Sequence, residues 1–197
     1  MKNLILLCSI ILLLGCSRND MEDNSTKLPP ETQIGANTFG VTIKNNIYIP
    51  RDPKGIDVGM QLKGMYITGS HENGYNYTEI VVLDGASPAG FKIILHIEDL
   101  ISSGVYTLKE SNFHDQIDSV KNTHIFFKIW DSSISNYAYY GSLENQGEIN
   151  IKRLSDGIIS GNFKGKFVRY DNSNDIIEIA DGRFDINSQT LPNHPFP

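Results

Sequence analysis

The chain has 197 residues, of which 40% are hydrophobic and 20% charged, a composition typical of a globular protein and not of a disordered or collagen-like one. Lysine and arginine total 17 against 23 aspartates and glutamates, which gives a net charge of −6. This acidic balance argues against nucleic acid as a partner, because non-specific binding to nucleic acid needs a basic surface. The length fits a single domain.

The N-terminal residues 1–15 have the features of a secretory signal. Lys2 supplies a positive charge, and residues 4–14 are apolar except for Ser9. This run is shorter than the roughly 20 residues that a membrane-spanning helix needs, and it fits the apolar region of a cleaved signal. Residues 13–16 read Leu-Leu-Gly-Cys and resemble a bacterial lipobox.

The lipobox resemblance implies cleavage before Cys16 and attachment of acyl chains such as palmitate to this residue. Two or more acyl chains hold a protein stably on a membrane, so the predicted partner of the N-terminus is a membrane. The alternative is an ordinary cleaved signal with an unmodified Cys16. Cys8 lies within the signal, so lipidation leaves the mature domain without a free cysteine for disulfides, thiolate metal sites or nucleophilic catalysis.

Residues 16–34 are predicted to be the lipidated cysteine and a flexible tether. Polar residues dominate this segment, and Pro29-Pro30 stiffens its end. The acidic cluster Asp20, Glu22 and Asp23 resembles the surface-export signals of lipoproteins from the Bacteroidota. The alternative interpretation of this cluster is a solvated linker.

Period-two alternation of apolar and polar residues begins near residue 36 and predicts strands. In chain order the candidate strands cover residues 38–43, 47–50, 91–98, 125–130, 148–152 and 159–167, and the run 125–130 is apolar enough to be covered on both faces. Asn45-Asn46, Asp84-Gly85, Asp156-Gly157 and Asp181-Gly182 predict turns between strands.

We therefore predict an all-β fold, an antiparallel β-sandwich or a β-barrel-like meander, as a single domain over residues 35–187. The Pro-rich tail, residues 188–197, contains three prolines and cannot continue a strand ladder. We expect this tail to lie across the surface or to trail free.

No established catalytic or metal-binding motif occurs, and we expect neither a cofactor nor a metal. The five histidines are not spaced as metal ligands, so each is expected to be an exposed strand or loop residue. Residues 171–175 with Glu178 partly resemble a calcium loop, but a polar hairpin turn explains them better. A carboxylate pair of a glycosidase is the remaining enzymatic alternative, with candidates Glu79, Asp84, Glu98, Asp99, Asp181 and Asp185.

Aromatic residues provide the candidate ligand-binding site. Trp130, Tyr137, Tyr139 and Tyr140 form a cluster in the sequence. Exposed tryptophan and tyrosine on a sheet can stack on sugar rings or act as interface hot spots. The alternative is ordinary cross-strand packing of aromatic residues.

The C-terminal half contains segments that point to a family. Residues 147–151 read GEINI, residues 157–163 read GIISGNF, and residues 179–185 read IADGRFD. With residues 35–40 (GANTFG), these segments resemble a family of uncharacterised all-β lipoproteins of the Bacteroidota, of flavobacterial type, in which an ISGxF strand precedes a TDGRFD element. Here Ala180 stands where the family has threonine. The resemblance implies an all-β lipoprotein domain and no particular activity.

Arg183 lies between two carboxylates in this last element, those of Asp181 and Asp185. It is predicted to form a structural ion pair or, alternatively, to bind a ligand. Taken together, the sequence predicts a non-enzymatic binding or structural module of the outer membrane, with a protein or glycan as the ligand. A hydrolase that acts on envelope or extracellular polysaccharide is the alternative.

Overall fold

The computed structural model describes residues 27–54, 63–70, 74, 76–114 and 120–197, and within them the chain forms ten strands and one 3-10 helix. The elements are β1 (Thr38–Ile43), β2 (Asn46–Tyr48), β3 (Met65–Ser70), β4 (Tyr77–Leu83), β5 (Lys92–Glu98), β6 (Gly104–Thr107), β7 (His124–Asp131), β8 (Asn136–Ser155), β9 (Ile158–Arg169), β10 (Asn172–Asn187) and η1 (Leu191–Asn193). The predicted all-β class is confirmed.

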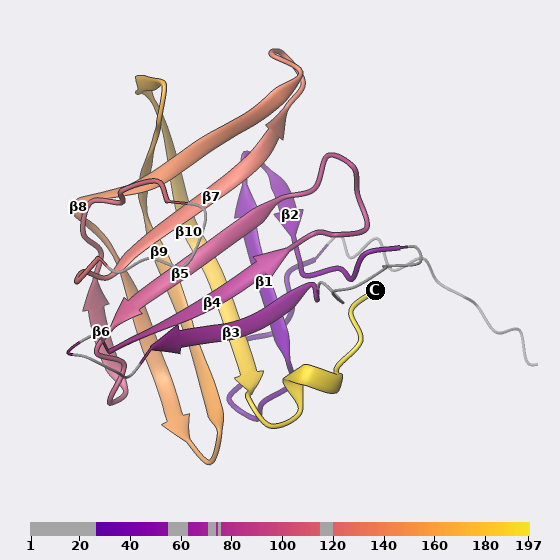
Figure 1. Ribbon diagram of the computed structural model, residues 1–197, viewed down its shortest axis with the longest axis vertical. Helices are drawn as coiled ribbons and strands as arrows, with labels where there is room; N and C mark the ends of the chain where they lie inside the picture. The colour runs from indigo at the N-terminus through magenta and orange to yellow at the C-terminus, as the bar shows by residue number, and fades with distance from the viewer. Residues whose placement is uncertain (1–26, 55–62, 71–73, 75, 115–119) are drawn as a thin grey trace, which may run out of the picture.

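These strands form one antiparallel sheet in the order β2-β1-β10-β9-β8-β7-β5-β4-β3, and β6 pairs with the second half of β8. The sheet coils, so that β3, β4 and β5 lie in front of β1, β9 and β10 (Figure 1). Because β2 and β3 end the order without pairing with each other, the sheet is not closed into a barrel.

The inner face of the coiled sheet holds the main hydrophobic core. Ile93 and Ile97 of β5 point into it and are fully buried, as the period-two pattern predicts. A smaller cluster lies on the outer face of β4, β5 and β7 and consists of Val81, Ile94 and Phe126. Both faces of β7 are therefore covered, as its almost continuous apolar sequence predicts.

Two of the predicted turns show why local signals succeed or fail. Asp156 and Gly157 join β8 to β9 with φ angles of 56° and 76°, the left-handed conformation that a tight hairpin turn requires. The turn predicted at Asp181-Gly182 is wrong. Both residues lie within β10, next to an irregularity in its pairing with β9 between Ile179 and Gly182, so this sequence codes for a β-bulge.

The gap between the two edges of the sheet is filled by irregular segments. Arg51, which follows β2, forms a parallel bridge with Asp84, which follows β4. The C-terminal segment adds Leu191 and Phe196, which are 4% and 8% exposed and belong to the main core. The three prolines keep this segment out of the strand ladder, as predicted, but the segment packs against the core rather than only crossing the surface.

Candidate functional site

Three of the four clustered aromatic residues lie together on the outer face of β7 and β8. Trp130 and Tyr137 are directly paired across the two strands, and their rings meet edge to face with centroids 5.4 Å apart. Tyr139 follows two residues later on the same side of β8, and its ring stacks on that of Phe126 with centroids 6.2 Å apart. Trp130 is 41% exposed and Tyr139 is 37% exposed.

Tyr170 extends this surface across β9. Its backbone N–H donates to the carbonyl of Tyr139 at 2.9 Å, and its ring meets that of Phe113 edge to face at 5.2 Å. Tyr170 is 71% exposed. Sequence reasoning missed this residue because it stands alone in the turn after β9. We call Trp130, Tyr137, Tyr139 and Tyr170 the outer aromatic surface.

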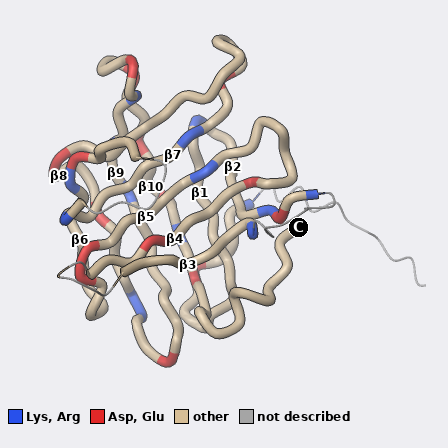
Figure 2. The backbone as a smooth tube through the Cα atoms, viewed as in Figure 1, with Lys and Arg blue, Asp and Glu red and all other residues tan. Residues whose placement is uncertain are grey.

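Lys128 borders the outer aromatic surface, whereas an ion-pair network lies on the opposite face of the same strands. The ammonium of Lys128 lies over the Tyr137 ring, 5.4 Å from its centroid. Arg169 bonds Asp131 at 3.1 Å and Asp171 at 2.6 Å, which joins the end of β7 to the turn after β9. Figure 2 shows acidic positions at the turn between β9 and β10 and close to the turn between β7 and β8.

The carboxylate of Asp131 stays ionised to low pH. Hydrogen bonds from the Ser133 hydroxyl and backbone N–H, together with the Arg169 guanidinium, lower the pKa of Asp131 below its usual value. The bonds to Asp171 and Asp131 raise the pKa of Arg169 further above its already high value. Both groups belong with Tyr140 on the inner side of the sheet, because Arg169 pairs with Tyr140 across β8 and β9 and lies 3.5 Å from Asp175.

Tyr140 does not belong to this surface. Successive residues of a strand point to opposite faces, so Tyr140 faces the interior whereas Tyr139 faces out. It is fully buried, and its ring stacks on that of Phe127 with centroids 5.1 Å apart. Its hydroxyl donates to Asp175 and accepts from Lys44, both at 2.9 Å. This network closes one end of the core.

Arg183 is also separate from the outer aromatic surface. It pairs with Asn162 of β9, which pairs with Asn150, in the half of β8 remote from Tyr139. Its guanidinium donates to two backbone carbonyls, those of Asp181 at 3.2 Å and Pro29 at 3.4 Å. Among the described contacts, Arg183 thus binds the backbone rather than the two neighbouring carboxylates.

Asp185 holds the N-terminal segment, residues 27–36, against the outer face of β10. The carboxylate accepts hydrogen bonds from the Thr32 hydroxyl and from the backbone N–H groups of Ile34, Gly35 and Ala36. Burial opposes ionisation of this carboxylate, but the four hydrogen bonds outweigh it and lower the pKa of Asp185. The described part of the predicted tether, residues 27–34, therefore packs on the sheet.

An unpredicted row of buried polar side chains crosses the outer face of β4, β5 and β7. Glu79, His96 and His124 are paired across these strands and are at most 2% exposed. The expectation of exposed histidines is wrong at His96 and His124, because this face is covered. The rings of His96 and His124 stack 4.7 Å apart, so they lie parallel and do not converge on a common point. No group of potential metal ligands occurs among the described residues.

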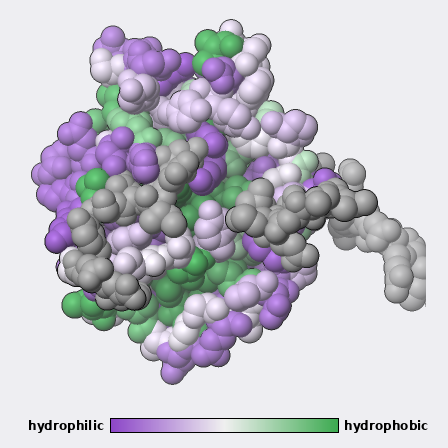
Figure 3. All heavy atoms as spheres, viewed as in Figure 1, coloured by the Kyte–Doolittle hydropathy of each residue, from purple (hydrophilic) through white to green (hydrophobic). Residues whose placement is uncertain are grey.

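The described surface carries several cavities beside its strands and the C-terminal segment. Cavities of about 480, 380 and 180 Å³ lie beside β3, beside β10 and beside the C-terminal segment. The face in Figure 3 carries hydrophobic colour at the tip of the β7–β8 hairpin, where Ile134 is 48% exposed. Glu178 and Asp181 line the cavity of about 380 Å³.

Comparisons with known proteins add no functional assignment. No protein-family model matches the chain, and no similar curated protein or solved structure was found. In the described part of the chain, no helix has the length and hydropathy required to cross a membrane. Cys16 lies outside the described residues.

Proposed function

We propose that this chain is a lipoprotein of the outer membrane that acts as a non-enzymatic binding module. Its ligand, a glycan or a partner protein, binds to the outer aromatic surface. The observation that carries this proposal is the clustering of Trp130, Tyr139 and Tyr170 in exposed positions on one face of the sheet. The strands beneath them are fixed by a core that is buried on both sides of β7.

Rigid aromatic side chains suit such a role because they offer a large contact area with few rotatable bonds. Tryptophan and tyrosine are enriched among residues that dominate binding energy, whereas most surrounding contacts contribute little. The edge-to-face contact with Tyr137 restrains Trp130 before any ligand arrives. A preorganised surface loses less conformational entropy on binding.

The membrane part of the proposal rests on the predicted lipidation of Cys16. The sequence of residues 13–16 and the apolar run before it provide the evidence for a lipid anchor. The test is incorporation of radiolabelled palmitate by the producing cells, compared between the wild-type chain and Cys16→Ser. We expect the label and membrane fractionation to be lost in Cys16→Ser, and a labelled Cys16→Ser protein would contradict lipidation at this residue.

The binding role is tested with the full lipidated protein in detergent micelles on a glycan array and against envelope extracts. The variants are Tyr139→Ala and Tyr170→Ala. The matched control is Ile101→Ala, which removes a 77% exposed side chain outside the outer aromatic surface. We expect each tyrosine variant to lose at least about tenfold in affinity for any ligand recovered, and the control to lose none.

The array and the extracts separate the two ligand classes. Retention of a purified glycan identifies a carbohydrate ligand, and recovery of one protein by the wild type but not by Tyr139→Ala identifies a protein ligand. Equal binding by wild type, Tyr139→Ala and Tyr170→Ala would contradict the proposed site. Hydrolysis of a polysaccharide by the purified protein would contradict the non-enzymatic role.

A further inference from the structure

Strands β1 and β10 separate before either strand has ended. Their pairing runs from Thr38 opposite Asp185 to Gly40 opposite Arg183. Two residues further along β1, the backbone N–H of Thr42 donates to the side chain of Asp181, at 3.1 Å, instead of to a ladder carbonyl. The carboxylate therefore lies between the two strands at the point where they diverge.

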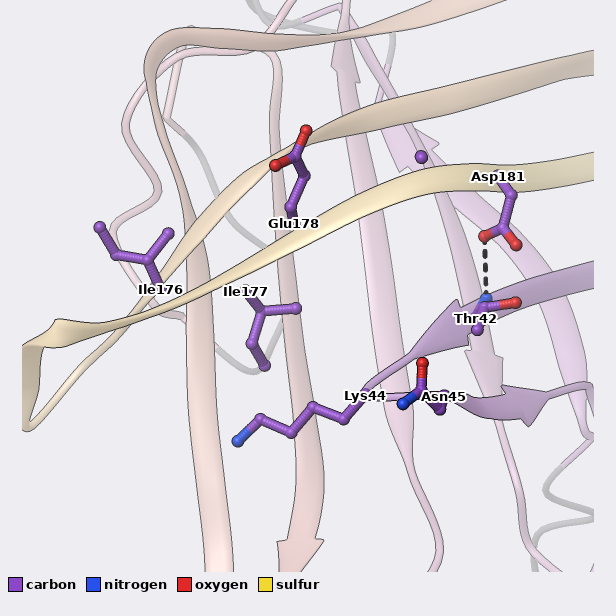
Figure 4. A pocket seen from close by; sticks show the side chains of 8 residues that line it. Thr42, Lys44, Asn45, Ile176, Ile177, Glu178 and Asp181 are labelled. Atoms are coloured by element: carbon purple, nitrogen blue, oxygen red, sulfur yellow. Dashed lines mark hydrogen bonds between the residues drawn. The ribbon is translucent and has the colours of Figure 1, made fainter.

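The separation leaves a cavity of about 380 Å³, which we call the edge pocket. Its lining residues come from β1, from the β1–β2 turn and from β10: Thr42, Lys44, Asn45, Ile176, Ile177, Glu178, Ala180 and Asp181. Figure 4 shows the open space between β10 and the β1–β2 hairpin, with Lys44 and Ile177 on one side of β10 and Glu178 on the other.

The edge of β10 that borders this pocket has no strand beside it in the described structure. Residues Ile176–Ile179 pair with β9 on one side, whereas β1 pairs only with the later residues 183–185. In a strand with one neighbour, the N–H and C=O groups of alternate residues point away from the ladder. An extended peptide can pair with such groups and add a strand to the sheet.

The charges at the edge pocket favour a basic occupant. Glu178 is exposed and lies opposite Lys166 in the ladder with β9, and Asp181 is half-buried and accepts from the Thr42 N–H. Lys44 is already engaged, because its ammonium donates to the Tyr140 hydroxyl at 2.9 Å and lies 3.9 Å from Asp175. Ile176, which is 51% exposed, adds an apolar contact at the outer end.

We infer that the β10 edge from Ile176 to Asp181 binds an extended peptide segment with basic side chains. The segment adds as a strand between β10 and the β1–β2 hairpin, and its lysine or arginine side chains meet Glu178 and Asp181. A second copy of this chain is a poorer occupant, because antiparallel pairing of two β10 edges brings like charges at Glu178 together. Residues 17–26 are also poorer, because Arg18 is outnumbered there by three acidic residues.

The test is fluorescence anisotropy with the full lipidated protein in detergent micelles and labelled six-residue peptides. The first peptide alternates lysine with valine, the second replaces lysine by glutamate, and the third is the lysine peptide with N-methylated backbone amides on alternate residues. We expect saturable binding of the lysine peptide alone. The glutamate peptide lacks the charge match and the N-methylated peptide lacks the donors for the ladder.

Glu178→Lys is expected to lower the affinity for the lysine peptide about tenfold. Glu110→Lys makes the same charge change at an exposed position outside the pocket and is expected to leave the affinity unchanged. Failure to bind the lysine peptide, equal binding of the N-methylated peptide, or equal effects of the two variants would overturn the inference. Concentration-dependent dimerisation that Glu178→Lys alters would overturn it in favour of a second copy.

Discussion

The rings of Trp130 and Tyr137 meet edge to face across β7 and β8, with centroids 5.4 Å apart and an angle of 86° between their planes. The positive edge of one ring thus lies against the negative face of the other. Trp130 is the single tryptophan of the chain, so its fluorescence reports on the outer aromatic surface alone. Binding of a ligand there is expected to change its emission maximum or intensity.

Substitutions on the outer and inner faces of β7 are expected to lower the stability of the protein by different amounts. Trp130→Ala should lower the free energy of unfolding by no more than about 1.5 kcal/mol, because the side chain is 41% exposed. Phe127→Ala should lower it by about 3–5 kcal/mol, because it leaves a cavity beneath Tyr140 and Phe167. Urea unfolding followed by circular dichroism measures both. Equal losses would contradict the assignment of inner and outer faces.

Asp185→Asn is expected to destabilise the protein by about 2–4 kcal/mol, because a buried amide cannot accept the four hydrogen bonds that the carboxylate accepts. Hydrogen exchange at the amides of Ile34, Gly35 and Ala36 should accelerate more than exchange in β5. Asp156→Asn, at an exposed turn, is the matched control and should change stability by less than about 0.5 kcal/mol. Unchanged exchange at residues 34–36 would contradict the anchoring role of Asp185.

The lowered pKa of Asp185 predicts how the stability of the protein depends on pH. The pKa of Asp185 is lower in the folded protein than in the unfolded chain, where it is near 3.9. The contribution of Asp185 to the free energy of unfolding is therefore complete above the pKa of the unfolded chain. It is lost as the pH falls through the lower pKa of the folded protein. Below about pH 4 the wild type should lose stability more steeply than Asp185→Asn, as measured by urea midpoints between pH 2 and pH 7.

Much of this fold could be predicted from the sequence, because alternation is a local property. The pattern of β5 and the apolar run of β7 follow from which side chains must be buried. The same alternation separates Tyr140 from Tyr139, since neighbours on a strand face opposite sides. Tyr170 carries no such signal, because it joins the outer aromatic surface only through the pairing of β8 with β9.

Other features depend on strand register, which the sequence leaves open. The contact between Glu79 and His96 requires β4 and β5 to pair in one register, and the bulge at Asp181-Gly182 depends on how β9 and β1 flank β10. An Asp-Gly pair favours a turn in isolation, but the pairing of Gly182 with Phe163 of β9 and of residues 183–185 with β1 keeps it within a strand. The covered outer face of β5, which buries His96, likewise comes from distant segments.

Gly182 provides a sharp test of the packing around this bulge. A β-carbon at this position would lie 2.3 Å from the ring of Phe163. Gly182→Ala is therefore expected to destabilise the protein by about 1–3 kcal/mol, because the buried ring must move. Combining it with Phe163→Leu should recover part of this loss, and the double variant should be more stable than the sum of the two single losses predicts. Strict additivity in urea unfolding would contradict a direct clash.

His96 and Glu79 form a buried contact, so their contributions to stability are expected to depend on each other. His96 Nδ1 lies 3.0 Å from Glu79 Oε1, and Nε2 lies 3.1 Å from the carbonyl of Val120. His96→Leu is expected to cost about 3–5 kcal/mol, because it leaves a buried carboxylate without this partner. Adding Glu79→Leu should restore much of that loss, since two apolar side chains then pack in place of two polar ones. Urea unfolding of the wild type, both single variants and the double variant gives the coupling energy. A double variant at least as unstable as His96→Leu would show that Glu79 has a further partner that still stabilises it when His96 is absent.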